Sequence, residues 1–363
     1  MKIGLIMHPY GEKESAGLGR AIFSLTKAII ESNGSHEYTI FLKGNHAPDP
    51  DIKGNKWKVQ RMPTHLFWLD QGLRLAPQQD VYIFFTPFMP LLPLSGRKIV
   101  VAHDFAYKYI PADNLQQKFT QYVLHFIHKK SLRNADSIIA ISEYTKQEIM
   151  RHFSIKSSTI KVIYNGFTPV CQIPVSQEAL EGGHFLFTGV IKPRKNVHSL
   201  IMAYAKAHEE YVGNNFPPLI LVGKNQGSYG NSLKKLVLEK ELQNKIIFKG
   251  YVNEEELRSL YRETLAFVFP SLIEGFGLPI LEAMNCGIPV ITSDQGAMKE
   301  IAGEAALLVD PNNIASIADG LKIIFEHPER RHELIEKGFR REKMFSWENT
   351  AEKYHEVIHL YEQ

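Results

Sequence analysis

The stretch from Pro270 to Asp294, PSLIEGFGLPILEAMNCGIPVITSD, constrains the fold more than any other part of the chain. It continues an apolar run that starts at Leu265, and it passes through a loop with two glycines into a short segment of helical character. Pro279 suits the first turn of a helix, where backbone N–H groups have no partner within the helix. Gly287 suits a left-handed helix cap, after which IPVITS can begin a strand. The pattern therefore predicts a βαβ unit.

The residues of this unit suit a ligand with a phosphate and a sugar. Gly275 and Gly277 would let a ligand approach the backbone closely, and a helix that starts at Leu278 would present N–H groups to a phosphate. Glu274 and Glu282 flank this cradle, but they share the sign of a phosphate and cannot neutralise it. Carboxylates accept hydrogen bonds from vicinal hydroxyls, as they do from a ribose. Together these features predict a nucleotide-sugar site.

The full pattern, E-G-F-G-L-P-x-x-E-A-M-x-x-G-x-P-V, resembles the E-x(7)-E signature of the family 4 glycosyltransferases, which are retaining enzymes of the GT-B fold. The match is nearly unbroken over 17 positions. The alternative, in which the glycines and the proline merely connect two strands, would suffice for a lone G-x-G. The resemblance implies that Glu274 is catalytic and that the donor is bound by the loop and the helix: Gly275, Phe276, Gly277, Leu278 and Glu282.

Length and composition limit which classes of protein the chain can belong to. A length of 363 residues predicts two domains, and 44% apolar with 22% charged residues is typical of a soluble globular protein. The net charge of +3 is too small to indicate nucleic acid as a partner. Cys171 and Cys286 are far apart in sequence, which fits a reducing cytosol. The first ten residues are too brief for a signal-peptide core, and Val81–Leu94 is too short to span a bilayer.

The strand–glycine–helix pattern occurs at the start of both halves of the chain. The resemblance implies an α/β protein with the GT-B fold, in which two doubly wound Rossmann-like domains face each other across an interdomain cleft. We expect an acceptor-side domain over residues 1–167, a linker over 168–183 and a nucleotide-sugar-binding domain over 184–344. Residues 345–363 are expected to form a helix that crosses back to the first domain.

Two features of the first domain carry expected site residues. A loop containing Gly17 and Gly19 should lead into a helix from about residue 18, and the resemblance implies that a backbone amide here touches the donor phosphate. The family usually has G-G-x-G-R, whereas this chain has Ala16 in place of the first glycine. His103 follows the strand 99–102, and the resemblance implies that it contacts the transferred sugar. The alternative is a structural histidine that caps the loop.

Three loops of the second domain carry further candidates. Arg194 and Lys195 follow the strand 184–188 and suit a diphosphate; the family has R-K-N here, and its lysine binds the donor diphosphate. Many relatives also have an arginine where this chain has Val190. After the next two strands, four residues are expected to line the donor: Gly223, Lys224, Tyr251 and Val252.

A helix is expected over Leu115–Arg133, with two contrasting faces. It could be an ordinary surface helix packed on the sheet, or a basic and partly apolar face that touches an anionic membrane. The apolar set is Phe119, Tyr122, Val123, Phe126 and Ile127, and the basic set is Lys118, Lys129, Lys130 and Arg133. Asp49–Asp51 has the form D-x-D, but its proline-broken polar surroundings indicate a solvated turn, so we expect no metal site there.

The function implied is the transfer of a hexose, with retention, from a nucleotide-diphosphate sugar to a hydroxyl of a glycan or lipid-linked acceptor in polysaccharide or lipopolysaccharide synthesis. No metal or other cofactor is expected. The PRKN loop resembles that of mannosyltransferases, which favours GDP-mannose over a UDP-sugar. The expected location is the cytoplasm, with peripheral attachment to the inner face of the membrane as an open alternative.

Other functions remain to be weighed. A nucleotide-sugar-binding partner subunit without catalysis and a GT-B-type nucleotide-sugar epimerase are the alternatives. A phosphorylase would need a pyridoxal lysine, and no lysine is singled out for that role. A nicotinamide dehydrogenase is disfavoured because no glycine completes a G-x-G-x-x-G motif after Gly17 and Gly19: Ile22 occupies the third position, and Phe23 follows it.

Overall fold

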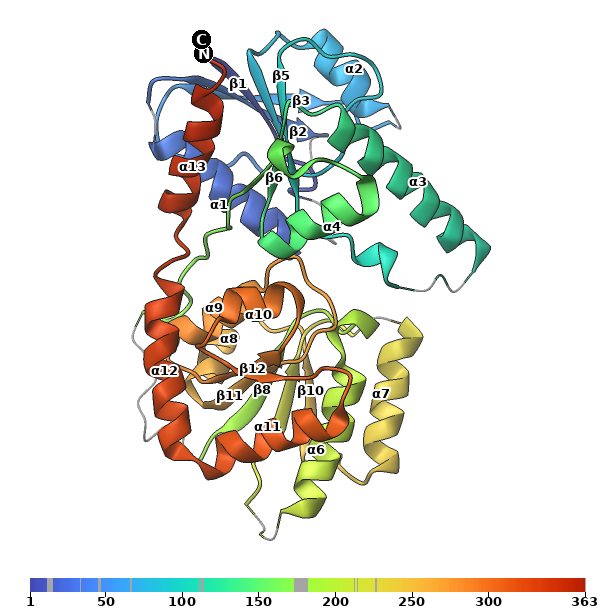
Figure 1. Cartoon of the computed structure of the whole chain (residues 1–363), viewed down its shortest axis with the longest axis vertical. Helices are drawn as coiled ribbons and strands as arrows, with labels where there is room; N and C mark the ends of the chain where they lie inside the picture. Colours follow the sequence, from blue (N-terminus) through green and yellow to red (C-terminus); the bar gives the residue numbers. More distant parts are fainter. Residues whose placement is uncertain are drawn as a thin grey trace. The chain divides into compact units, whose positions relative to one another are not determined.

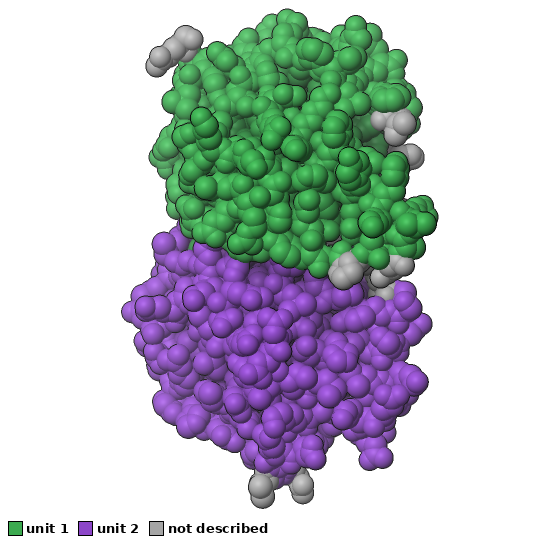
Figure 2. All heavy atoms as spheres, turned by 45° about the vertical axis from the view of Figure 1, so that its right-hand side comes forward, with its two compact units in different colours: residues 1–168, 345–363 green, residues 169–344 purple. Residues whose placement is uncertain are grey.

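The computed structural model describes residues 1–11, 16–32, 34–44, 47–65, 67–110, 112, 114–172, 182–211, 213, 215–225 and 227–362. The chain forms two compact units, coloured separately in Figure 2. Unit 1 comprises residues 1–168 and 345–363, and unit 2 comprises residues 169–344. Each unit contains one parallel sheet with helices on both sides (Figure 1).

The sheet of unit 1 has seven strands in the order β3-β2-β1-β4-β5-β6-β7. The strand order reverses between β1 and β4, as in a doubly wound fold. Its central strands are continuous apolar runs because both faces of the sheet are covered. The strands are β1 Lys2–Ile6, β2 Glu37–Lys43, β3 Trp57–Met62, β4 Val81–Phe84, β5 Arg97–Ala102, β6 Ser137–Ala140 and β7 Ile160–Val162.

The helices of unit 1 include one from the end of the chain. Helix α13 (Trp347–His359) packs along α1 (Ala16–Ser32), as Figure 1 shows. Helix α1 begins at Ala16, so Gly17 and Gly19 lie in its first turn. The prediction that both glycines lie in the loop before the helix was wrong. The other helices are α2 Trp68–Leu75, α3 Leu115–Arg133 and α4 Glu143–Phe153, with 3₁₀ turns η1 Ala106–Lys108 and η2 Ser157–Thr159.

The sheet of unit 2 has six parallel strands in the order β10-β9-β8-β11-β12-β13. Here the order reverses between β8 and β11. Strand β11 is buried along its whole length, as the apolar run before the glycine loop predicts. The strands are β8 His184–Thr188, β9 Leu219–Val222, β10 Ile246–Gly250, β11 Thr264–Phe269, β12 Val290–Ser293 and β13 Leu307–Val309.

Helix α9 (Leu278–Asn285) confirms the predicted βαβ unit. Pro279 lies in its first turn, and Gly287 has φ of 74°, the left-handed cap that the sequence predicts. The remaining helices of unit 2 are η3 Pro193–Lys195, α6 Val197–Glu210, α7 Gly227–Glu239, α8 Glu254–Arg262, α10 Gly296–Ala302, α11 Ile314–Glu326 and α12 Pro328–Glu342.

The two cysteines form a disulfide between Cys171 and Cys286, although 115 positions separate them. The prediction of a reducing environment, which rested on their separation in sequence, was therefore wrong. The amides of Val170 and Cys171 also donate hydrogen bonds to Oδ1 of Asn285, at 3.0 and 3.1 Å. The start of the linker is thus fastened to the last turn of α9. Of the remaining linker, residues 173–181 lie outside the described residues.

None of the described helices combines the length and the apolar character needed to cross a bilayer.

Candidate functional site

The strand order places the main candidate site at the carboxyl ends of two inner strands of the second sheet. In a doubly wound sheet, ligands bind beyond the carboxyl ends of the strands where the order reverses. Strands β8 and β11 are the neighbours at this reversal. The turn η3, which follows β8, carries Arg194 and Lys195, and the loop after β11 carries Glu274. The topology therefore brings the predicted cations and the predicted carboxylate together.

Glu274 makes an ion pair with each of these cations. Its Oε2 lies 2.5 Å from Nη1 of Arg194, and its Oε1 lies 2.6 Å from Nζ of Lys195. The ammonium of Lys195 also lies 4.4 Å from the centre of the Phe269 ring, and Arg194 donates a hydrogen bond to the carbonyl of Ile273 at 3.0 Å. Glu274 and Lys195 are both only 8% exposed. These contacts hold the charged groups in one arrangement.

The charge balance of this cluster favours an anionic ligand. Burial by itself raises the pKa of the Glu274 carboxyl, but the neighbouring Lys195 and Arg194 outweigh burial, and the pKa lies below its usual value. The carboxylate is therefore ionised at neutral pH. Two cations and one anion leave one positive charge at the carboxyl edge of the sheet. A diphosphate can complement that charge with charge-assisted hydrogen bonds.

Asn196 ties the two loops of the site together. It adopts a left-handed backbone conformation, with φ of 60° and ψ of 31°. Its Nδ2 donates hydrogen bonds to the carbonyls of Pro270 at 3.1 Å and Pro311 at 2.7 Å. Asn196 is buried, and it directly follows the cation pair. We did not predict this role, although the R-K-N motif contains the signal for it.

The start of α9 forms the predicted cradle, with fewer donors than expected. Its cap residue Gly277 has φ of 115°, a conformation that other residues adopt only with strain. Pro279 has no N–H, and the amide of Ile280 already donates to the carbonyl of Gly277 at 2.9 Å. Among the described residues, the amides of Gly277 and Leu278 remain for a phosphate, together with the positive end of the helix dipole.

Glu282 lies one turn further along α9 and is oriented by a residue that we did not predict. The hydroxyl of Tyr261, in α8, donates a hydrogen bond to Oε2 of Glu282 at 3.3 Å. Burial, followed by the charge of Glu282, raises the pKa of Tyr261 well above its usual value, so its hydroxyl stays protonated. Glu282 itself is partly exposed and keeps acceptor capacity for a ligand hydroxyl.

The candidates that follow β9 and β10 also lie at the carboxyl ends of the strands of this sheet. Gly223 has φ of 141°, and a Cβ atom there would lie 1.9 Å from the carbonyl oxygen of Gly189, so this glycine is required for the close packing of two strand ends. The ammonium of Lys224 lies 5.7 Å from the ring centre of Tyr251, which is 71% exposed. Val252 follows and is partly exposed. An aromatic surface with a cation beside it suits a stacked base.

In unit 1, the first turn of α1 carries the two predicted glycines. Gly17 is exposed, and a Cβ atom there would meet nothing within 4 Å. Gly19 is buried. The first-turn amides of a helix have no acceptor within the helix, so this turn can serve an anion. Residues 12–15, just before α1, lie outside the described residues.

His103 follows β5 and is held by one ring nitrogen. Its Nε2 lies 2.7 Å from the carbonyl of Phe85, so Nε2 carries the proton and donates it. Burial lowers the pKa of His103, and the Phe85 carbonyl and Asp104 only partly oppose this effect. The ring is therefore neutral at physiological pH, and Nδ1 can accept a hydrogen bond from a hydroxyl. The hydroxyl of Thr145 fixes the backbone by donating to the His103 carbonyl at 3.0 Å.

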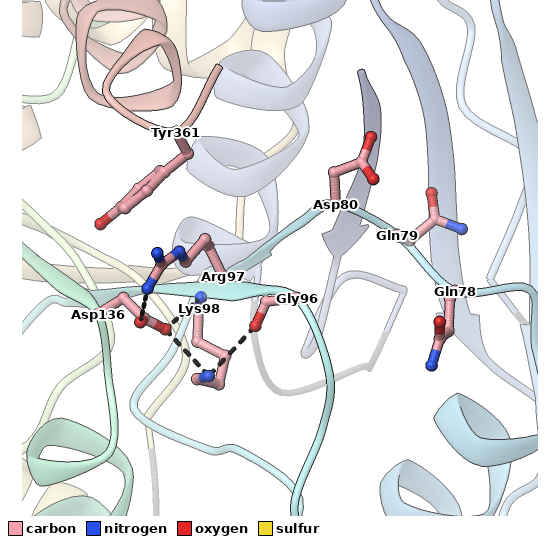
Figure 3. Close-up of a pocket in the computed structure, with 8 residues that line it drawn as sticks. All are labelled: Gln78, Gln79, Asp80, Gly96, Arg97, Lys98, Asp136 and Tyr361. Atoms are coloured by element: carbon pink, nitrogen blue, oxygen red, sulfur yellow. Dashed lines mark hydrogen bonds and ion pairs between the residues drawn. The ribbon is translucent and has the colours of Figure 1, made fainter. Parts of the chain in front are cut away.

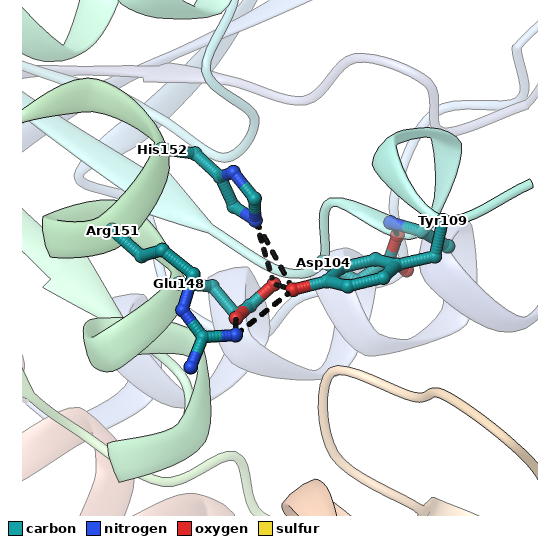
Figure 4. A network of polar contacts seen from close by, with 6 residues as sticks. Asp104, Tyr109, Glu148, Arg151 and His152 are labelled. Atoms are coloured by element: carbon teal, nitrogen blue, oxygen red, sulfur yellow. Dashed lines mark hydrogen bonds and ion pairs between the residues drawn. The ribbon is translucent and has the colours of Figure 1, made fainter.

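A polar network around Glu148 was not predicted from the sequence. Glu148, in α4, is 3% exposed and accepts a hydrogen bond from the hydroxyl of Tyr109 (Figure 4). Arg151 and His152 lie 3.3 and 3.2 Å from its two carboxylate oxygens. The network joins the segment after η1 to α4. Asp104 lies next to it and accepts from the amide of Ala106 at 3.1 Å.

Other polar features of unit 1 lie apart from these residues. A cavity of about 490 Å³ lies at the amino ends of β4 and β5, opposite the carboxyl-end edge, where Asp136 pairs with Arg97 and Lys98 (Figure 3). Asp49, of the D-x-D sequence, lies 2.6 Å from Arg61 in an ion pair. A loop carboxylate paired with an arginine fits the predicted solvated turn.

The fold and the site agree with the protein families that the chain matches. Residues 16–169 match the model described as Glycosyltransferase Family 4, and residues 172–341 match the model described as Glycosyl transferases group 1. The chain belongs to the family 4 glycosyltransferases, and it is a hexosyltransferase by class.

Two bacterial relatives are similar over most of their length. The O-antigen chain mannosyltransferase B of Escherichia coli is 32% identical over 77% of this chain and 74% of the relative. The O-antigen chain mannosyltransferase RfbU of Salmonella typhimurium is 30% identical over 77% of this chain and 76% of the relative.

Solved structures with low sequence identity share the fold. Sucrose-phosphate synthase of Thermosynechococcus elongatus has a TM-score of 0.76 at 21% identity and covers 99% of this chain and 98% of its own. WaaG, a glycosyltransferase involved in lipopolysaccharide biosynthesis, has a TM-score of 0.74 at 17% identity, with 99% of both chains covered. The chain has the GT-B fold of these glycosyltransferases.

Proposed function

We propose that this glycosyltransferase transfers a mannosyl residue from GDP-mannose, with retention of the anomeric configuration, to a hydroxyl of a glycan or lipid-linked acceptor in O-antigen or related lipopolysaccharide synthesis. The observation that carries the donor side of the proposal is the buried cluster of Arg194, Lys195 and Glu274 at the reversal of strand order. The two O-antigen mannosyltransferases support mannose as the sugar.

The difficult step of the reaction is departure of the diphosphate from the anomeric carbon. Negative charge grows on the diphosphate as that bond breaks, and fixed cations stabilise the growing charge. Arg194 and Lys195 would bind the two phosphates, and the amides of Gly277 and Leu278 would add neutral donors. Because Glu274 holds both cations before the donor arrives, little reorganisation is needed at the moment of reaction.

The same cluster gives Glu274 two tasks. Its carboxylate oxygens are both occupied by cations in the structure. A diphosphate that binds Arg194 and Lys195 would take over part of that pairing and release acceptor capacity on Glu274 for a sugar hydroxyl. Glu282, oriented by Tyr261, would accept from the ribose diol. Separately, Nδ1 of the neutral His103 can accept a hydrogen bond from a sugar hydroxyl.

Retention is the stereochemical part of the proposal. A retaining hydrolase would use a nucleophile and a protonated acid about 5 Å apart. Glu274 is ionised, so it cannot act as the protonated acid, and the two cations that bind its oxygens make it a poor nucleophile. The leaving phosphate would then accept the proton of the attacking hydroxyl on the same face of the sugar. No residue of the chain is assigned as a general base in this step.

The test is a transfer assay with GDP-mannose and a mannose-terminated glycan acceptor, followed by NMR of the product. We expect an α-linked product, which preserves the configuration of GDP-α-mannose, and at least a tenfold loss of kcat/KM in Glu282→Gln with GDP-mannose. A β-linked product would overturn retention, and transfer only from UDP-sugars would overturn the proposed donor. Tight binding of the donor without any transfer would favour a catalytically silent partner subunit.

We further propose that helix α3 attaches the enzyme to an anionic membrane surface. The alternative in which its apolar face packs on the sheet does not fit the exposure of Phe119, Tyr122 and Phe126, which are 69%, 72% and 58% exposed. Only Ser131 and Leu132 of α3 are buried. Lys118 and Lys129 supply positive charge to the same helix. Exposed aromatic residues beside lysines suit the boundary between anionic headgroups and acyl chains.

Sedimentation with phosphatidylglycerol vesicles tests this attachment. The wild type should sediment with these vesicles, less with vesicles of phosphatidylcholine alone, and less at high salt. Phe119→Ser with Phe126→Ser should lower the bound fraction several-fold. The control is Leu238→Ser, because Leu238 is also an exposed apolar residue, 62% accessible, but lies on α7 in unit 2. Equal binding by the double variant would contradict the role of α3.

A further inference from the structure

A second cluster of potential ligand atoms lies in unit 1, at the amino end of β2 and the end of α13. His359 is the last residue of α13, Glu362 follows three positions later, and His36 directly precedes β2. One ligand atom from each of these three residues lies within 4.8 Å of the other two. The cluster therefore joins two segments from opposite ends of the sequence.

The buried ring of His36 is the main reason to expect a ligand in this cluster. It is 2% exposed, and neither ring nitrogen has a hydrogen-bond partner among the described residues. Its Nε2 lies 3.5 Å from Oε1 of Glu362, and its ring centre lies 5.9 Å from that of His359. A buried imidazole without hydrogen bonds is unfavourable unless another group satisfies its nitrogens. One of its ring nitrogens lies within 4.8 Å of a ligand atom of each of the two groups that could share a cation with it.

Two imidazoles and one carboxylate form a donor set that suits Zn²⁺. With ligand bonds of about 2.0–2.1 Å in a tetrahedron, the ligand atoms would lie roughly 3.3 Å apart. Nδ1 of His359 already lies 2.5 Å from Oε2 of Glu362 in an ion pair, Nε2 of His36 lies 3.5 Å from Oε1 of Glu362, and the three ligand atoms lie within 4.8 Å of one another. An ion would therefore take the place of the direct contact between His359 and Glu362 and draw both toward His36. His359 and Glu362 are partly exposed, with side chains 50% and 36% accessible, and can move onto the fixed ring of His36.

The surroundings keep the two segments aligned. His355 lies one helical turn before His359 on α13, and its Nε2 lies 3.0 Å from the carbonyl of Ile29 and 3.0 Å from the hydroxyl of Ser32. Ile29 and Ser32 belong to α1, so this contact fixes α13 against α1. The last turn of α13 is thereby held beside His36.

We propose that His36, His359 and Glu362 bind one Zn²⁺ ion, with water as the fourth ligand. His36 stands at the amino end of β2, whereas ligands of doubly wound sheets react at the carboxyl ends. The ion would lie on the opposite side of the sheet from those ends, and it would join the end of α13 to the start of β2. This site is independent of the donor and of the transfer reaction.

The test uses the full chain without an affinity tag, because a histidine tag would itself bind zinc. Equilibrium dialysis against ZnCl₂ with metal analysis should give one Zn²⁺ per chain, and Co²⁺ should give the visible absorption of a tetrahedral site. His359→Ala and Glu362→Gln should each weaken Zn²⁺ binding at least about tenfold. Both side chains are partly exposed, so these variants should fold.

His332→Ala is the matched control. His332 lies 3.4 Å from Glu336 on α12, and both side chains are exposed, so this pair resembles His359 and Glu362 without a buried third ligand. The control should bind Zn²⁺ like the wild type. The proposal is overturned if the wild type holds no stoichiometric Zn²⁺, or if His359→Ala and Glu362→Gln bind it as tightly as the control. Circular dichroism of each variant confirms that the comparison is between folded proteins.

Discussion

Glu274 determines the charge arrangement of the donor side, because it is the anion between Arg194 and Lys195. We predict that Glu274→Gln lowers kcat by about 100-fold or more, since the two cations lose the partner that positions them. It should also lower the free energy of unfolding of unit 2 by about 3 kcal/mol, because buried charges are left unpaired. Steady-state kinetics and urea unfolding measure the two effects.

Glu210→Gln is the control for this prediction. Glu210 also accepts from two lysines, Lys206 and Lys322, but it lies on the surface. Its substitution should leave both kcat and stability unchanged, because exposed ion pairs contribute little. Equal losses in the two variants would show that any paired glutamate matters and would remove the special role of Glu274.

Asn196 allows its backbone conformation and its hydrogen bonds to be tested separately. Asn196→Ala removes the bonds to Pro270 and Pro311 and places an alanine at φ of 60°. Asn196→Gly removes the same bonds but tolerates the conformation. We expect both to destabilise unit 2, and Ala by about 1 kcal/mol more than Gly in urea unfolding. A glycine variant as stable as the wild type would show that the two hydrogen bonds are dispensable.

The site residues differ in how far a sequence can predict them. The carboxylates and cations stand in short motifs, so Glu274, Arg194 and Lys195 could be named in advance. Partners that the chain brings together over long distances could not. Asn196 bonds to a carbonyl 115 residues away, and the cysteines are separated by the same distance. Tyr261 is one tyrosine among many until the fold places its hydroxyl beside Glu282.

At the scale of elements, strand β8 carries a pH-sensitive residue. His184 begins this strand, is 5% exposed and lies 3.3 Å from the hydroxyl of Thr264. Burial, with Lys249 nearby, lowers the pKa of His184 to about 4. In the unfolded chain its pKa returns to about 6.5, so between pH 6.5 and 4 the unfolded state binds a proton that the folded state excludes.

The stability of unit 2 should therefore be full above pH 6.5 and decline as the pH falls toward 4. The contribution of His184 is up to about 3 kcal/mol, and His184→Gln should flatten this part of the profile. Urea unfolding followed by circular dichroism measures it. Tryptophan fluorescence follows unit 1 separately, because Trp57, Trp68 and Trp347 all belong to unit 1. If the free energy of unfolding of His184→Gln depends on pH as that of the wild type does, His184 is not the source of the pH dependence.

The elements themselves were predictable where their pattern was long. The structure has α3 over Leu115–Arg133, the predicted bounds, because amphipathic spacing continues over several turns. Strand β3 (Trp57–Met62) and helix α2 (Trp68–Leu75) were not predicted. Strand β3 lies at the edge of its sheet and is only partly buried, so it lacks a continuous apolar run. Helix α2 has only eight residues, too few for a clear period.

At the scale of the whole molecule, the GT-B fold combines two sheets whose strand orders each reverse once. The sequence could predict this architecture because its motifs resemble those of the family 4 glycosyltransferases, and the strand, glycine-bearing segment and helix at the start of each half are consistent with it. It could not predict the disulfide that fastens the linker to α9. With Asn285 bonded to the same segment, the linker is anchored to the helix whose other end forms the phosphate cradle.

Calorimetric titration of the whole chain with GDP-mannose measures directly whether Arg194 and Lys195 form a nucleotide-sugar diphosphate site. We predict that the wild type binds GDP-mannose, that Lys195→Ala binds it roughly 10- to 100-fold more weakly, and that Lys206→Ala, a surface lysine of α6, is unchanged. If Lys195→Ala binds GDP-mannose as tightly as the wild type, Lys195 does not bind the diphosphate. If neither GDP-mannose nor any UDP-sugar binds the wild type, the cluster is not a nucleotide-sugar site.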